Sequence, residues 1–345
     1  MKNRKLMIVL GGLIIGIMSG LLVKFGNPGN MGVCIACFLR DISGSIGLHS
    51  TSKLAYIRPE VIGIVLGAFI SALVFKEFNV KGGSAPFTRF LLGMTVMIGA
   101  LAFLGCPLRM VLRLAGGDLN AILGIAGFAA GIGVGVIFLN NGFTLKRNYS
   151  QPKAGGYMLP VIMVVLLVAV IAKPAFLIFG VDGKLPPHAP ILLALVAGLI
   201  TGVVAQRTRL CMVGGIRDII LFKDNYLLLG FLSILLGAFV TNLLFGNFNV
   251  GFVDQPAAHN VWYINFIGMF VAGWGSVLLG GCPLRQLILS SEGNVDSSVT
   301  IMGLMMGAGV AHNLKMVAAA PNTMTALIVL LVFLLFVSIV NREVI

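Results

Sequence analysis

The five cysteines of this 345-residue chain all lie in short polar stretches, and four of them recur in two copies of the same motifs. Gly-Cys-Pro-Leu-Arg occurs around Cys106 and again around Cys282, and Cys-x5-Arg-Asp-Ile begins at Cys34 and again at Cys211. A proline directly after a cysteine suits the first position of a helix, where its missing N–H costs nothing. Cys106 and Cys282 are therefore expected at helix N-termini, where free N–H groups and the helix dipole favour an anion.

An arginine follows each of these four cysteines. Arg109 and Arg285 come three residues after theirs, about one helical turn, and so project from roughly the same face. Arg40 and Arg217 are each followed directly by an aspartate, so these two either contact a bound anion or pair with the neighbouring carboxylate. Four cationic side chains beside four thiols indicate a site for an anion.

Three kinds of chemistry are open to the thiols. Metal binding has little support, because the chain holds one Cys-x-x-Cys, Cys34 to Cys37, and its four histidines show no ligand spacing. The same two cysteines would suit a membrane thiol–disulfide oxidoreductase. Alternatively the thiols line a path, since polarisable sulfur holds a soft sulfur or selenium anion loosely enough to release it. Cys37 has no counterpart in the second copy, where Gly214 stands, so its role is left open.

The elements that position these residues are membrane spans. Of all residues 58% are hydrophobic and 10% charged, and the mean hydropathy is +1.04, which excludes a soluble enzyme, a disordered chain or a nucleic-acid binder. Ten apolar stretches qualify as spans, the ninth being the weakest: 6–23, 60–78, 89–105, 119–139, 157–179, 189–206, 226–246, 262–281, 297–312 and 323–341. The runs that begin at Cys34, Cys106, Leu210 and Cys282 are too short to cross and are predicted as short or re-entrant helices shielded inside the bundle. No cofactor-binding motif is found.

The repeated motifs indicate an internal duplication. The two Gly-Cys-Pro-Leu-Arg copies stand 176 residues apart, and Leu66-Gly67-Ala68-Phe69 recurs as Leu236-Gly237-Ala238-Phe239. We expect a first repeat at 1–180 and a second at 181–345, each with five spans. Because five is odd, the second repeat enters the membrane from the opposite side, which is the inverted-repeat organisation of many transporters. The predicted fold is thus an all-α polytopic membrane protein with about nine or ten transmembrane helices, hourglass-like, with one vestibule per repeat.

Charge and glycine spacing complete the expected topology. With the N-terminus inside, fifteen lysines and arginines fall on the cytoplasmic side and nine outside, which favours both termini in the cytoplasm and explains the net charge of +13. The basic start shows no cleavage site, so no signal peptide is expected. Five Gly-x3-Gly motifs, beginning at Gly16, Gly63, Gly127, Gly198 and Gly303, predict close helix packing.

The duplicated cysteine motifs resemble the YeeE/YedE family of sulfur transport membrane proteins over essentially the whole chain. The sequence that begins at Cys211, Cys-Met-Val-Gly-Gly-Ile-Arg-Asp, looks most like the YedE-type branch associated with selenium metabolism. The resemblance implies an hourglass-shaped inverted-repeat bundle in the cell (inner) membrane. It also implies uptake of thiosulfate or a selenium analogue, passed between cysteines by S–H hydrogen bonds, without enzymatic activity, metal or cofactor. A cytosolic sulfur or selenium carrier protein is a compatible partner. The resemblance carries over by motif to Cys106, Cys282, Cys34 and Cys211. Together with the residues that the spacing singles out, the candidate site residues are Cys34, Cys37, Cys106, Cys211, Cys282, Arg40, Arg109, Arg217 and Arg285.

Overall fold

Helices make up almost all of the regular structure in this computed structural model, which describes residues 2–181 and 184–343. Ten long helices match the ten predicted spans: α1 (Lys2–Lys24), α3 (Pro59–Val74), α4 (Pro86–Ala102), α6 (Asn120–Asn140), α7 (Lys153–Ala172), α8 (Ile191–Thr208), α10 (Tyr226–Leu244), α11 (Trp262–Leu278), α13 (Val295–Asn313) and α14 (Thr323–Val340). Four short helices interrupt them: α2 (Ile35–Ser45), α5 (Pro107–Ala115), α9 (Met212–Phe222) and α12 (Pro283–Ser291). A 3₁₀ turn, η1 (Ser52–Leu54), and the two-residue strands β1 (Lys81–Gly82) and β2 (Tyr149–Ser150) lie in loops.

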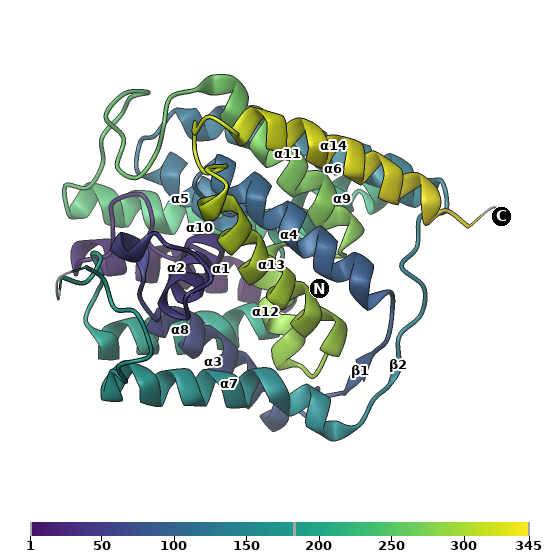
Figure 1. Cartoon of the computed structure of the whole chain (residues 1–345), viewed down its shortest axis with the longest axis horizontal. Helices are drawn as coiled ribbons and strands as arrows, with labels where there is room; N and C mark the ends of the chain where they lie inside the picture. The colour runs from purple at the N-terminus through teal and green to yellow at the C-terminus, as the bar shows by residue number, and fades with distance from the viewer. Residues whose placement is uncertain (1, 182–183, 344–345) are drawn as a thin grey trace.

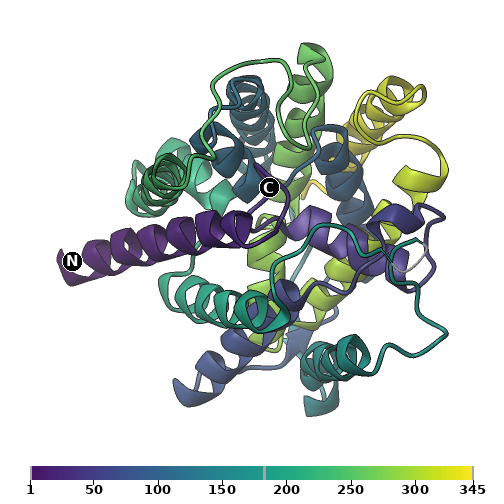
Figure 2. The ribbon, with the colours of Figure 1, turned by 90° about the vertical axis from the view of Figure 1, so that its left-hand side faces the viewer.

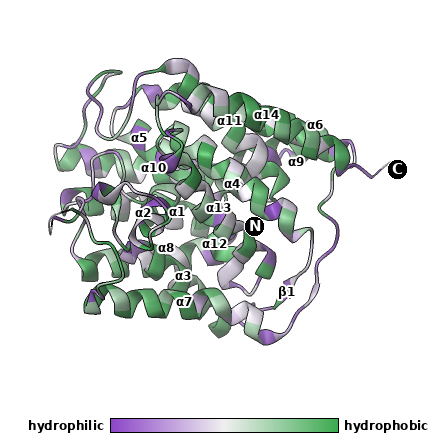
Figure 3. Ribbon diagram, in the orientation of Figure 1, coloured by the Kyte–Doolittle hydropathy of each residue, from purple (hydrophilic) through white to green (hydrophobic). Residues whose placement is uncertain are grey.

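Eight helices within the described ranges are long and apolar enough to cross a membrane. In this count α4 with α5, α8 with α9, and α11 with α12 each form one apolar stretch of 30 to 32 residues. The 16-residue α3 is a shorter apolar helix, and α13 is not among the eight, in agreement with its being the weakest predicted span. Hydrophobic residues cover the long helices, and hydrophilic ones gather in the loops (Figure 3). The protein is an all-α polytopic membrane protein.

Eight of the ten long helices form two rows of four, and α7 and α14 pack outside them. One row has the order α13, α4, α11, α6, and the other has the order α10, α1, α8, α3, as their contacts show. The short helices lie between the rows, since α2 contacts both α13 and α3, and α5 contacts both α6 and α10. In Figure 1, α11 and α6 lie in the upper part of the molecule and α8 and α3 in the lower part. Figure 2 shows α1 lengthwise, whereas most of the other long helices are seen nearly end on.

Contacts between the two halves of the sequence are reciprocal. Helix α1 packs on α10 and its sequence counterpart α8 packs on α3, while α4 packs on α13 and its counterpart α11 packs on α6. The last helices depart from this scheme, because α7 packs on α3 but α14 packs on α11. The two predicted repeats, 1–180 and 181–345, are therefore interleaved in space and do not form separate bodies. Residues 1, 182–183 and 344–345 lie outside the described residues.

Glycine makes these rows possible. A Cβ added at Gly202 on α8 would lie 2.1 Å from the carbonyl oxygen of Ile64 on α3, and one at Gly131 on α6 would lie 2.1 Å from that of Phe270 on α11. All five predicted Gly-x3-Gly motifs face a neighbouring helix in this way. The predicted close packing through small residues is confirmed, and it brings α2, α5, α9 and α12 together in the middle of the protein.

Candidate functional site: two cysteine pairs at helix N-termini

Each of the four repeat-related cysteines is the N-cap of a short helix. Cys34 caps α2, Cys106 caps α5, Cys211 caps α9 and Cys282 caps α12. The Cys34 sulfur accepts a hydrogen bond from the Cys37 amide at 3.3 Å, and the Cys211 sulfur accepts one from the amide at position 214, three residues on, at 3.4 Å. The predicted placement of Cys106 and Cys282 at helix N-termini is confirmed, and it extends to Cys34 and Cys211.

The cysteines form two pairs. The thiols of Cys34 and Cys106 lie next to each other, and so do those of Cys211 and Cys282. All five cysteines are free thiols. In each pair one cysteine comes from a Cys-x5-Arg-Asp-Ile motif and the other from a Gly-Cys-Pro-Leu-Arg motif, so each pair joins two N-termini whose dipoles favour the same anion.

Cys211 lines an open cavity of about 260 Å³, and its partner Cys282 is buried beside it. One water needs about 10–15 Å³ measured in this way, so the cavity has room for a small hydrated anion. The lining residues are mostly charged: Arg4, Arg209, Cys211, Arg217, Asp218, Asp224, Tyr226, Leu227, Gly280 and Arg285. Four arginines face two aspartates, which gives this cavity an excess of positive charge.

Arg285 is the least exposed of the four arginines, and its guanidinium is only partly satisfied. Its Nη2 lies 3.5 Å from a Glu292 oxygen, and its Nη1 is buried without a hydrogen-bond partner among the described residues. A buried polar group that lacks a partner costs about 1–3 kcal/mol, and more if it is charged. Arg285 is thus prepared to bind an anion that reaches Cys282.

Arg217 pairs with Asp218 at 2.8 Å, and this pair forms part of the cavity wall. Arg40 is likewise bonded to Asp41, at 2.6 Å. For both arginines the structure shows the carboxylate pairing that the sequence left open.

The cluster around the other pair is closed. Cys34 and Cys106 are at most 1% exposed, and Arg109 beside them is 1% exposed. Arg109 donates to the carbonyl oxygens of Asn30 at 3.0 Å, Ala257 at 2.9 Å and Leu104.

Arg109 also donates to the Cys37 sulfur at 3.0 Å, so Cys37, which has no repeat counterpart, belongs to this cluster. No carboxylate within the described ranges pairs with Arg109. Arg109 is therefore a buried cation held only by neutral groups.

Loop length explains the difference between the two clusters. The α10–α11 loop, residues 245–261, begins in the same way as its counterpart in the first repeat, residues 75–85. The backbone N–H of Asn249 donates to the carbonyl oxygen of Gly116, and the backbone N–H of Asn79 donates to that of Glu292, both at 2.9 Å. The α10–α11 loop then runs on, so that the Ala257 carbonyl reaches Arg109. In Figure 1 this loop lies at the left end of the molecule, opposite the β1–β2 pair at the right.

Sequence reasoning missed three residues of these clusters. Arg58, at the start of α3, donates to Asp41 at 2.7 Å, so that a fully buried carboxylate is shared by two arginines. Arg209 and Glu292 pair at 2.8 Å behind the open cavity. Arg58 and Arg209 were counted as loop charges, although the position of Arg209 two residues before a motif cysteine was an available signal.

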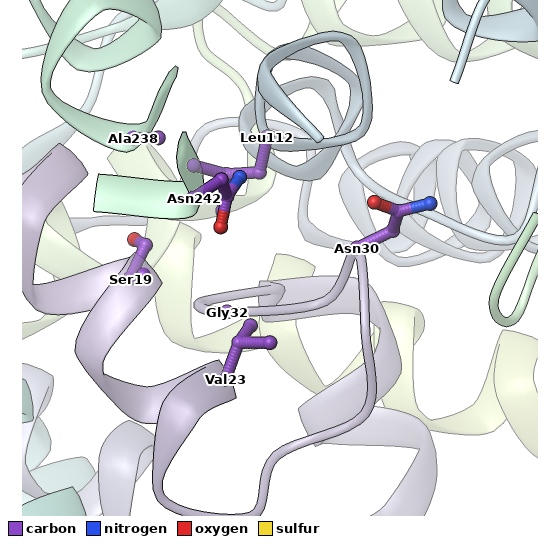
Figure 4. A pocket seen from close by; sticks show the side chains of 8 residues that line it. Ser19, Val23, Asn30, Gly32, Leu112, Ala238 and Asn242 are labelled. Atoms are coloured by element: carbon purple, nitrogen blue, oxygen red, sulfur yellow. The ribbon is translucent and has the colours of Figure 1, made fainter. Parts of the chain in front are cut away.

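Other features do not compete for the role. A small cavity beside Ser19, Asn30 and Asn242 measures about 10 Å³ and holds at most one water (Figure 4). In residues 2–181 and 184–343 no group of three or more His, Cys, Asp or Glu side chains is arranged to hold a metal ion. Cys34 and Cys37 are free thiols, so the structure does not favour the oxidoreductase alternative. That alternative stays a prediction, and mass mapping that finds an oxidised Cys34–Cys37 bond would support it.

The fold and the paired sites define a polytopic membrane protein with buried thiols and arginines along its middle. The profile of the family described as Sulphur transport matches residues 207–340. The chain is 31% identical to the thiosulfate transporter TsuA of Escherichia coli strain K12 over 124 residues, which are 36% of this chain and 34% of that protein. It is 39% identical to TsuA of Spirochaeta thermophila over 100 residues, 29% of each chain.

A third relative is the uncharacterized protein MJ1590 of Methanocaldococcus jannaschii. It is 31% identical over 87 residues, which are 23% of this chain and 81% of that protein. The chain belongs to the YeeE/YedE sulphur-transport family. The matched segment spans about a third of the length of the thiosulfate transporters.

Proposed function

We propose that the protein transports a small sulfur-containing anion of the thiosulfate type across a membrane. The observation that carries the proposal is the open arginine-lined cavity, which reaches Cys211 at the N-terminus of α9, with Cys282 at the N-terminus of α12 buried beside it. Arginines and helix N-termini attract an anion, and neutral thiols bind its polarisable sulfur weakly. Weak binding suits transport, because a cargo that enters must also leave.

The proposed path runs from this cavity to the buried pair of Cys34 and Cys106. Helix α5 packs against α9 and α2 against α12, so the two pairs belong to one central group of short helices. Along it Arg285 binds the anion in the open cavity, and Arg109 binds it at the closed cysteine cluster after its bonds to the Ala257 carbonyl and to Cys37 have been broken. In this scheme Arg40 and Arg217 stabilise the anion through their charge while they remain bonded to their aspartates.

The two halves are proposed as inverted repeats that exchange access. The reciprocal packing of α1 on α10 and α8 on α3 supports a two-fold relation. One cysteine pair lies beside an open cavity, which Cys211 lines, and the other pair is covered, as alternating access requires of any single state. With both termini in the cytoplasm of an inner-membrane protein, the open cavity beside Arg4 faces the cytoplasm, where a sulfur carrier protein would collect the anion.

The cargo is assigned at the level of chemical class. Two relatives are named thiosulfate transporters, which supports a sulfur anion. Selenium analogues are proposed as second substrates, because selenium shares the soft, polarisable character that a thiol-lined path selects.

Uptake of labelled thiosulfate into proteoliposomes tests the proposal. We expect saturable uptake by the wild-type protein, and a loss of at least about tenfold in Cys106→Ala and Cys282→Ala, since each removes the thiol at a helix N-terminus. The corresponding serine variants keep a hydrogen-bonding group of similar size and should retain part of the uptake. Selenium analogues and sulfate are assayed as competitors. Full uptake in both alanine variants would refute the cysteine path, and no uptake of any sulfur or selenium anion would refute the substrate class.

A further inference from the structure

Glu292 occupies an unusual position behind the open cavity. It caps the C-terminus of α12, the helix that begins after Cys282, and its backbone carbonyl accepts a hydrogen bond from Asn79 at 2.9 Å. Its carboxylate is nearly buried and contacts two cavity arginines, Arg209 at 2.8 Å and Arg285 at 3.5 Å. The anchored backbone holds the carboxylate in this place.

The two contacts of Glu292 are unequal. The one to Arg209 has the length of a strong charge-assisted hydrogen bond, whereas the one to Arg285 is long and leaves the Nη1 of that arginine without a partner among the described residues. Glu292 therefore lowers the positive potential at Arg285 without saturating its donors. An entering anion and Glu292 act on the same two guanidinium groups from opposite sides.

The charge balance gives this contact weight. The cavity is lined by four arginines and two aspartates, and Arg209 also contacts two glutamates outside the lining, Glu292 and Glu77. Removing the charge of Glu292 would make the surroundings of Arg209 and Arg285 more positive by one charge. A divalent anion responds to such a change about twice as strongly as a monovalent one, because the Coulomb energy scales with the charge.

The other half of the protein has no equivalent carboxylate. The position 176 residues before Glu292 is Gly116, where even a Cβ would lie 2.1 Å from the Asn30 side-chain oxygen. There Arg109 is satisfied by neutral carbonyl groups. Among the described residues, a carboxylate therefore contacts the arginine of Gly-Cys-Pro-Leu-Arg at Arg285 and not at Arg109.

We propose that Glu292 is a resident counter-anion that competes with the transported anion for Arg209 and Arg285, and so sets affinity and release at the open cavity. The inference rests on the proposed function. It assigns Glu292 as a positioning and affinity-tuning residue that does not itself touch the cargo. Competition of this kind weakens binding and speeds release, which is what a transporter requires.

Glu292→Gln tests the inference, because glutamine keeps the size of glutamate and one acceptor oxygen and removes its charge. We expect thiosulfate to bind the purified variant roughly three- to tenfold more tightly than wild type, with a lower maximal rate of uptake in proteoliposomes. A purely structural residue would lower both affinity and rate. Glu292→Asp keeps the charge and should stay close to wild type in affinity.

Glu77→Gln is the matched control. Glu77 pairs with Arg207 and with Arg209, at 2.9 Å to the latter, but has no contact with Arg285. Because Glu77 contacts only one of the two competing arginines and is more exposed than Glu292, we expect a smaller gain in affinity, at most about twofold. If Glu292→Gln does not fold, Glu292→Ala removes the same charge and replaces it in the assay.

The outcomes separate the inference from the proposed function. Equal or weaker binding in the neutral Glu292 variant than in wild type would overturn the inference alone. A wild-type protein that binds no sulfur anion would overturn the proposed function and the inference with it.

Discussion

Helix packing at glycine yields a prediction whose size follows directly from the structure. In Gly131→Ala the new Cβ on α6 would lie 2.1 Å from the carbonyl oxygen of Phe270 and 2.9 Å from its carbonyl carbon. Ordinary contacts of this kind begin at 3.4 Å, and both atoms belong to the α11 backbone, so no side chain can turn away. Helices α6 and α11 must separate by about 1 Å along their line of contact.

The cost of this separation is at the upper end of the range for overpacking. Extra methyl groups forced into packed cores cost about 1–3 kcal/mol, and we expect about 3 kcal/mol here because backbone meets backbone. Since α11 continues into α12, the displacement also moves Cys282 and should reduce uptake of the anion.

Gly133→Ala on the same helix is the matched control, because its Cβ would meet nothing within 4 Å. We expect it to stay within about 1 kcal/mol of wild type, with a small gain from alanine's helix propensity. Thermal unfolding of both variants in detergent, followed by fluorescence of Trp274, which packs on Phe270, provides the comparison. Equal unfolding temperatures for the two variants would refute the argument that Gly131 sets the approach of α6 to α11.

Three further predictions concern the site and its loops. Gly280→Leu places a side chain in the open cavity at a position with φ of +80°, so we expect strongly reduced uptake and a cost of about 1 kcal/mol; unchanged uptake would contradict the assignment of this cavity. Asp41→Asn leaves two buried arginines with a neutral partner, and we expect a loss of about 3–5 kcal/mol in thermal unfolding. Burial lowers the pKa of His259 below its ordinary value of 6.5, and its ring Nε2 donates to the Ala102 carbonyl at 2.7 Å. The stability that neutral His259 gives the α10–α11 loop is full above pH 6.5 and is lost as the pH falls through the lowered pKa. The hydrogen-exchange protection factors of residues 245–261, which correct for the intrinsic pH dependence of exchange, should therefore fall on acidification, and less so in His259→Gln.

Local spacing in the sequence was enough for much of the architecture. The ten long helices, the four short ones and the helix N-terminal cysteines follow from apolar length, from proline after Cys106 and Cys282, and from the duplicated motifs. These features depend on neighbours within a few turns. Glycine spacing likewise indicated which helix faces pack closely, because a residue without Cβ lets the backbone of a neighbouring helix approach.

Contacts between distant residues were decided by the tertiary structure. The sequence made Arg109 and Arg285 look equivalent, since both follow Gly-Cys-Pro-Leu. In the fold the longer α10–α11 loop covers Arg109 with the Ala257 carbonyl, whereas Arg285 stands in an open cavity beside Glu292. The contacts that a loop makes, and the pairing of charges far apart in the chain, depend on how the helices pack and cannot be predicted from a local motif. The repeats therefore specify two similar sites, and only the tertiary structure makes one open and the other closed.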